Sequence, residues 1–124
     1  MTVVDTSVLI DVLRGRDDAK AALLKARAMG ALHASEVSRL EVFTGMRKDE
    51  EGPTRSLLAA ITWHPVDERI SEIAGELGRA WLPGDRGIDS ADLAIAATAL
   101  SLDTVPLTLN VKHFPMFAGL NAPY

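Results

Sequence analysis

The stretch TVVDTSVLID, residues 2–11, starts with a short β-branched run, reaches an acid at Asp5 and continues as an apolar, helix-like segment. β-branched residues favour strands, and a strand followed at once by a helix is the first half of a βαβ unit. An acid at the end of the strand can hold a cation, while Thr6 or Ser7 caps the helix. The alternative is that Asp5 is only an N-cap, a role that aspartate often fills.

The alternation of strand and helix continues through the rest of the chain. We expect strands at residues 2–4, 31–34, 61–66 and 105–109. Helices are expected at residues 7–13, 19–29, 35–45, 53–60, 67–82 and 90–101, with turns at residues 14–18 and 47–53, a helical turn at 112–117 and a fifth, short edge strand in the last residues. Strands separated by helices predict a parallel sheet with right-handed crossovers, and in such sheets the site lies beyond the carboxyl ends of the strands.

Composition limits the classes of function. The 124 residues suit one domain spanning 1–124, and a hydrophobic content of 48% argues against disorder. The absence of cysteine excludes a disulfide framework and a thiolate metal site. With no signal-peptide pattern and no apolar run of bilayer length, we expect a soluble, cytoplasmic protein without membrane association. The net charge of −4 argues against a general basic surface for nucleic acids, although a divalent cation can neutralise clustered acids.

The segment IDSADLAIAATA, residues 88–99, carries the strongest acidic signal. Asp92 lies near the start of a helix that is otherwise almost wholly apolar, and helices of this kind are buried. Asp89 is three residues earlier and can share its helix face. The alternative is that Asp89 caps the helix and Asp92 fills the third position, where the helix dipole favours an acid.

A weaker signal is Glu41, which borders an apolar stripe formed by Val37, Leu40 and Phe43. A carboxylate beside a buried face needs a partner, because burying an unpaired charge is costly. The alternatives are a capping-box glutamate three residues after Ser38 or an ordinary solvated side chain.

Together these acids predict a metal site. Three or four carboxylates at one edge of a sheet repel one another strongly without a cation. Oxygen ligands without cysteine favour Mg²⁺, with Mn²⁺ as a substitute, over zinc. Such a site suits phosphodiester hydrolysis, because the metal activates a water, orients the phosphate and neutralises the leaving oxygen.

Four segments resemble, in order and spacing, the motifs of PIN-domain nucleases of the VapC type: VVDTSVLID (3–11), EVSRLEV (36–42), DLAIAATA (92–99) and LTLNVKHF (107–114). The resemblance implies a three-layer α/β/α sandwich with a central, mostly parallel sheet and Mg²⁺-dependent endoribonuclease activity. By position, Asp5 and Asp92 would be the principal metal ligands, and Glu41 would join them directly or through water. Such proteins are toxins of toxin–antitoxin pairs. They are usually homodimers, inhibited by a VapB-type antitoxin whose tail enters the acidic groove.

The fourth motif departs from this pattern, because many members carry an acid at or near Asn110 or His113. Asn110 can still offer a carbonyl oxygen or hold a metal-bound water, and Asp89 can supply the missing charge. His113 can touch phosphate, but without an acidic cluster of ligand spacing it is not interpreted as a metal ligand. The motif therefore supports a second metal ion less well than the first. Weak or absent nuclease activity is an open alternative.

The remaining polar residues have plainer interpretations. Thr6 can hydrogen-bond a ligand or a carboxylate, but it can also serve only as a helix cap. The candidates for phosphate contact are Lys112, Arg86, Arg39 and Arg14, each of which is equally understood as solvated charge. Structural roles are expected for His33 and His64, and a core or dimer-interface position for Trp63 and Trp81.

Two other functions compete with this interpretation. A phosphoacceptor receiver domain needs adjacent acids after strand one, an acceptor aspartate ending strand three and a later Lys-Pro pair. Here Thr6 follows Asp5, residues 64–67 read HPVD, and no Lys-Pro pair occurs. The second alternative is a PIN-like module that binds a partner or RNA without cutting, since Asn110 stands where an acid is often found.

Overall fold

The computed structural model of the chain describes residues 1–84 and 87–124. At its centre lies a four-stranded parallel sheet of β1 (Thr2–Val4), β2 (Leu32–Ser35), β3 (Thr62–His64) and β4 (Pro106–Leu107). The strand order is β3-β2-β1-β4, and Val3 pairs with His33 on one side and Pro106 on the other. The chain therefore crosses to opposite sides of β1. In parallel sheets, ligands bind at such a switch point.

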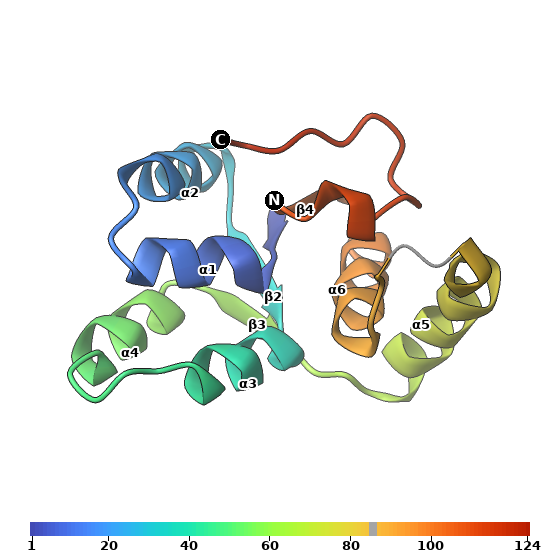
Figure 1. Cartoon of the computed structure of the whole chain (residues 1–124), viewed down its shortest axis with the longest axis horizontal. Helices are drawn as coiled ribbons and strands as arrows, with labels where there is room; N and C mark the ends of the chain where they lie inside the picture. The colour runs from blue at the N-terminus through green and yellow to red at the C-terminus, as the bar shows by residue number, and fades with distance from the viewer. Residues whose placement is uncertain (85–86) are drawn as a thin grey trace.

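Six helices in the described residues flank the sheet: α1 (Thr6–Leu13), α2 (Asp17–Met29), α3 (Glu36–Thr44), α4 (Glu51–Ala59), α5 (Glu68–Trp81) and α6 (Ser90–Ser101). Two 3-10 turns, η1 (Leu82–Gly84) and η2 (Val111–His113), complete the regular structure. Figure 1 shows α1 to α4 on one side of the strands and α5 and α6 on the other. This confirms the expected α/β/α sandwich. Across the described ranges, no helix is both long enough and apolar enough to span a bilayer.

The centre of the sheet is buried on both faces, and the two valines of β1 show this directly. Val4 belongs to a core that includes Leu9, Leu23 and Ala34, from α1, α2 and β2. Its neighbour Val3 belongs to a second core around α6, with Ile95 and Phe114 among its members. Successive side chains of a strand point to opposite faces, so the side chains of one short strand pack against the helices on both faces of the sheet.

Helix α6 is the central helix that its composition predicts. Every residue from Asp92 to Ala99 is buried, and the helix packs against α5, α3, β1 and β2. Alanine side chains allow this close approach, and the buried Thr98 hydroxyl is satisfied by the Ala94 carbonyl at 2.8 Å. The candidate site residue Asp92 therefore lies on the most enclosed helix of the described structure.

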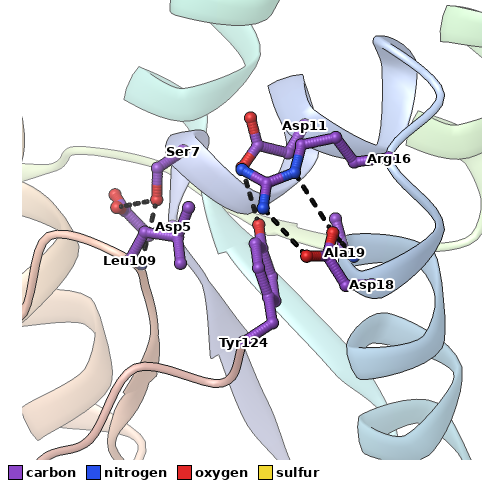
Figure 2. A network of polar contacts seen from close by, with 8 residues as sticks. All are labelled: Asp5, Ser7, Asp11, Arg16, Asp18, Ala19, Leu109 and Tyr124. Atoms are coloured by element: carbon purple, nitrogen blue, oxygen red, sulfur yellow. Dashed lines mark hydrogen bonds and ion pairs between the residues drawn. The ribbon is translucent and has the colours of Figure 1, made fainter.

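The expected fifth strand is wrong, because residues 118–124 contain no regular secondary structure. The tail instead crosses toward the α1–α2 side of the molecule (Figure 1). There the Tyr124 hydroxyl donates to Asp11 Oδ2 at 2.8 Å, and the Arg16 guanidinium lies over the Tyr124 ring at 5.0 Å. Figure 2 shows this cluster, in which burial raises the pKa of Tyr124. Side-chain contacts, not backbone pairing, hold the end of the chain.

Several expected boundaries also move. The expected turn at residues 47–53 ends early, because α4 begins at Glu51 and holds Pro53 in its first turn. Proline is tolerated there, since the first N–H groups of a helix have no intrahelical partner. The strands expected at 61–66 and 105–109 shorten to β3 and β4, and the helical turn expected at 112–117 is the 3-10 turn η2.

Candidate active site

A pocket of about 230 Å³ lies where β1 and β4 end and α1 and α6 begin. Its lining contains all six side chains that the sequence predicted as catalytic or supporting: Asp5, Thr6, Glu41, Asp89, Asp92 and Asn110. Ser7, Ile10 and His113 complete the lining. A larger pocket of about 480 Å³ lies between α5 and α6, but its described lining holds no carboxylate. Chemistry, not size, therefore marks the smaller pocket.

Asp5 occupies the N-cap position of α1, yet within the described structure its side chain makes no capping bond. It is only 2% exposed, and its Oδ2 atom accepts the Ser7 hydroxyl at 2.7 Å and the Thr108 hydroxyl at 2.6 Å. Ser7 in turn accepts the Leu109 N–H at 3.3 Å (Figure 2). These bonds tie the ends of β1 and β4 together and orient the carboxylate. The interpretation of Asp5 as a helix cap alone does not account for them.

Glu41 reaches the same pocket from α3. Its Oε1 atom accepts the Thr6 hydroxyl at 2.7 Å, and that hydroxyl lies 2.8 Å from the buried Ser38 hydroxyl. Because a hydroxyl has one hydrogen, Ser38 donates to Thr6 when Thr6 donates to Glu41. Glu41 is not a capping-box residue, since the N-cap of α3 is Ser35, which accepts the Val37 N–H.

Asp92 and Asp89 form the reciprocal capping box that was the plainer interpretation of this pair. Asp89 Oδ1 accepts the Asp92 N–H at 2.8 Å, and Asp92 Oδ2 accepts the Asp89 N–H at 3.1 Å. Capping does not remove the electrostatic problem, however, because Asp92 is 8% exposed. Burial raises its pKa to about 6; the Asp89 and Asp5 carboxylates also raise it, while the Asp89 N–H and His113 lower it. A buried carboxylate of this kind beside two others is a place where a bound cation has a large effect.

His113 lines the pocket, although the sequence suggested for it only a phosphate contact and no role as a metal ligand. Its Nδ1 atom lies 3.3 Å from Asp92 Oδ2, and its ring lines the pocket. The only sequence signal was its position in the fourth motif, where an acid is more usual. The structure shows an imidazole facing Asp92 instead.

This arrangement can be compared with known proteins. The family described as PIN domain matches residues 2–114. Over the full length of both chains, the sequence is 40% identical to the Mycobacterium tuberculosis protein named ribonuclease VapC19. It is 41% identical to ribonuclease VapC10 of the same organism, covering 100% of this chain and 93% of that protein.

The chain is a PIN-domain protein of the VapC type.

Solved structures agree with this membership. A toxin–antitoxin complex from Klebsiella pneumoniae contains a chain with a TM-score of 0.82 and 28% identity, covering 100% of this chain and 98% of that one. VapBC-1 from nontypeable Haemophilus influenzae gives a TM-score of 0.75 at 22% identity, covering 98% and 95%. The second of these likenesses concerns the fold alone.

Of the basic residues expected to contact phosphate, the three that the structure describes do not line the acidic pocket of this PIN domain. Arg39 pairs with Glu36 at 2.7 Å and lies 4.4 Å from the centre of the Trp63 ring, in a different pocket. Arg14 donates to both oxygens of Glu50. Lys112 is exposed in η2, beside His113 in the chain, and Arg86 lies outside the described residues.

The two remaining histidines are not among the residues that line the acidic pocket. His33 and His64 lie on β2 and β3, and their ring nitrogens Nδ1 and Nε2 are 2.8 Å apart. This contact agrees with the structural role expected for both.

The donor set suits a hard divalent cation, but it is not arranged as a finished coordination shell. In the described part of the chain, no three acidic or histidine side chains stand close enough together to hold a metal ion as placed. Asp5 and Glu41 are engaged by hydroxyl donors, which do not neutralise charge. The carboxylates and the Asn110 amide are suitable oxygen ligands for a divalent cation, the group that PIN-domain nucleases generally use. The raised pKa of Asp92 fits the same cation, whose charge would offset that of the carboxylates.

Proposed function

We propose that this chain is the toxin nuclease of a toxin–antitoxin pair and that it hydrolyses RNA phosphodiester bonds with a divalent cation, Mg²⁺ or Mn²⁺. The observation that carries the proposal is the convergence of Asp5, Glu41 and Asp92 in one pocket, from three separate elements. The names of the VapC19 and VapC10 relatives, both ribonucleases, support the reaction class.

Each residue has a distinct part in this proposal. Asp5 and Asp92 hold the cation and Glu41 completes its shell directly or through water. When bound, the cation supplies an activated water and neutralises the charge that develops during in-line displacement. Thr6 and Ser38 hold the Glu41 carboxylate. Asp89 fixes the start of α6 through the capping box, and Asn110 borders the space left for the phosphate.

The proposal extends to partners. The similar solved structures are toxin–antitoxin complexes, which supports a VapB-type antitoxin as the partner of this chain. A basic antitoxin segment in the acidic pocket would compensate the same carboxylates that a cation compensates. We also propose a homodimer and an RNA substrate bound across the pocket, with Lys112, which lies in the fourth motif and precedes His113 in η2, as a phosphate contact.

The direct test is cleavage of a labelled, structured RNA pool by purified protein freed of antitoxin, in Mg²⁺, in Mn²⁺ and in EDTA. Asp5→Asn and Asp92→Asn should each lower the cleavage rate by about 100-fold or more, because each removes a charged ligand. Glu76→Gln, an exposed site on α5, is the matched control and should leave the rate unchanged. The products should carry a 5′-phosphate and a 3′-hydroxyl.

Other results point elsewhere. Cyclic phosphate ends would indicate attack by the ribose 2′-hydroxyl and contradict the proposed mechanism. Equal cutting by all four proteins would identify a contaminating ribonuclease. No cutting by folded protein in either metal would favour the second candidate, a PIN-like module that binds without cutting. The observation that favours that candidate is the presence of Asn110 and His113, neither of them acidic, in the pocket lining.

A further inference from the structure

His113 places a nitrogen donor at the edge of an otherwise oxygen-rich pocket. Its Nδ1 atom is 3.3 Å from Asp92 Oδ2, and the two side chains are 23% and 11% exposed. Of the three histidines in the sequence, His33 and His64 contact each other across β2 and β3. His113 is therefore the imidazole that the fold brings to the carboxylates.

The backbone and the packing of the ring fix which nitrogen is presented. The other ring nitrogen, Nε2, lies against Gly87, where an added Cβ atom would come within 3.4 Å of it. The backbone of His113 is fixed by its own N–H, which donates to the Asn110 carbonyl at 2.8 Å, and by the fully buried Phe114 that follows. The Nδ1 edge is thus held toward Asp92 before any ligand arrives.

The separation of the two atoms suits two neighbouring ligands of one ion. Ligands at right angles around an octahedral ion, each about 2.1 Å from it, lie about 3 Å from each other. Asp92 Oδ2 and His113 Nδ1 are within a few tenths of an ångström of that separation. A cation between them would therefore meet two donors at close to the spacing of neighbouring ligands.

Nitrogen and oxygen donors do not bind all divalent ions equally. Mg²⁺ prefers carboxylate, phosphate and water oxygens and gives up its waters reluctantly. Imidazole is a ligand for first-row transition metals, and Mn²⁺ is the member of that series that also accepts carboxylates readily. A mixed edge of one carboxylate and one imidazole therefore favours Mn²⁺ over Mg²⁺.

We infer that His113 and Asp92 jointly ligate the divalent cation and that His113 gives this pocket a preference for Mn²⁺ over Mg²⁺. The inference rests on the metal site of the proposed function. It reverses the order expected from the sequence, in which Mg²⁺ came first and His113 was not a ligand.

The test measures metal binding, not cleavage. Mn²⁺ and Mg²⁺ affinities are determined by calorimetry on the full chain for the wild type, His113→Asn, His113→Asp and Asp92→Asn. Removing the imidazole in His113→Asn should weaken Mn²⁺ binding by about tenfold and change Mg²⁺ binding by less than about twofold. The carboxylate in His113→Asp should strengthen Mg²⁺ binding. His64→Gln is the matched control and should bind both ions as the wild type does.

Pulsed electron paramagnetic resonance on Mn²⁺ bound to the wild-type protein gives an answer that needs no variant. A directly bound imidazole produces a nitrogen coupling to Mn²⁺, and labelling histidine with ¹⁵N should change that coupling. The coupling should persist in His64→Gln and vanish in His113→Asn where that variant folds.

The outcomes separate the two levels of the proposal. Mn²⁺ bound by the wild type without a nitrogen coupling, and equally well after His113→Asn, overturns the role of His113 and leaves the metal site intact. Failure of the wild type to bind either ion, with Asp92→Asn indistinguishable from it, overturns the metal site and this inference with it.

Discussion

The two halves of the pocket satisfy their carboxylates in different ways. In the hydroxyl half, formed by Asp5 and Glu41, the donors are the neutral hydroxyls of Ser7, Thr108 and Thr6. In the α6 half, formed by Asp89, Asp92 and His113, Asp92 accepts a backbone N–H and faces an imidazole, and burial raises its pKa to about 6.

The difference separates orienting a carboxylate from compensating its charge, and both matter for the proposed cation site. Hydroxyl donors orient a carboxylate without supplying a positive charge, so they set the hydroxyl half in position without compensating it electrostatically. The α6 half carries the electrostatic cost, because its central carboxylate is buried among other acids. We therefore expect the two halves to respond in opposite directions when their carboxylates are neutralised.

The largest expected effect is on the free energy of unfolding of the metal-free protein. The pKa of Asp92 is about 6 in the folded protein, compared with 3.8 for an ordinary aspartate. Its ionised form therefore destabilises the fold, and its contribution to stability falls as the pH rises from about 4 to about 6. In EDTA at pH 8, Asp92→Asn should raise the free energy of unfolding by about 1–2 kcal/mol, although the proposed metal site predicts that the same variant loses cation binding. Urea unfolding between pH 4 and pH 8 measures this.

Asp5→Asn is the matched test in the hydroxyl half. The carboxylate there accepts two hydroxyls through one oxygen, and charge-assisted bonds of this kind weaken in an amide. We expect the free energy of unfolding to fall by about 1 kcal/mol. If both variants shift stability in the same direction, the distinction between the halves is wrong.

The sequence was informative about the residues whose signals are local. Asp5 stands between a strand and a helix, and Asp92 interrupts an apolar helix; both signals lie within a few neighbouring residues. The rule that parallel strands present their carboxyl ends at one edge then places these acids together, and the structure brings Asp5, Glu41 and Asp92 into one pocket. The α/β/α sandwich followed from the same alternation.

Residues whose partners are distant in the chain could not be found in this way. Thr108 donates to Asp5 across 103 positions, and Ser38 reaches Thr6 across 32. Such contacts depend on the register of β4 beside β1 and on the angle at which α3 meets α1. The same limit explains the wrong fifth strand, because nothing near Tyr124 in the sequence shows that Asp11 will accept its hydroxyl.

Thr108→Val tests the hydroxyl half with a smaller change. Valine has nearly the shape of threonine, but it removes the donor to Asp5 and leaves the Asn110 N–H without its acceptor. Since Thr108 is 1% exposed, water cannot easily replace these bonds, and the free energy of unfolding should fall by about 1 kcal/mol or slightly less. Thr104→Val removes a hydroxyl that donates to the Met1 carbonyl in an exposed setting, and its effect on the same urea midpoint should be smaller. Equal losses would mean that the buried hydroxyl has no special part in holding Asp5.

The smallest expected effect is that of His33, which does not line the pocket and whose titration opposes that of Asp92. Burial lowers the pKa of His33, and the neighbouring His64 lowers it further, as does the N-terminal amine. The contribution of neutral His33 to stability is thus present above pH 6.5 and is lost as the pH falls through its lowered pKa. Acidification has the opposite effect at Asp92, whose protonation below about pH 6 stabilises the fold.

The pH dependences of stability due to His33 and Asp92 oppose each other in the wild type. His33→Gln should therefore increase the gain in stability on going from pH 6.5 to pH 4.5 by less than about 1 kcal/mol. In the double variant His33→Gln, Asp92→Asn the gain itself should disappear, which would assign the slope to Asp92. A slope that persists in the double variant would have to come from another acid, and the α6 half would then differ from the hydroxyl half in its donors but not in its electrostatics.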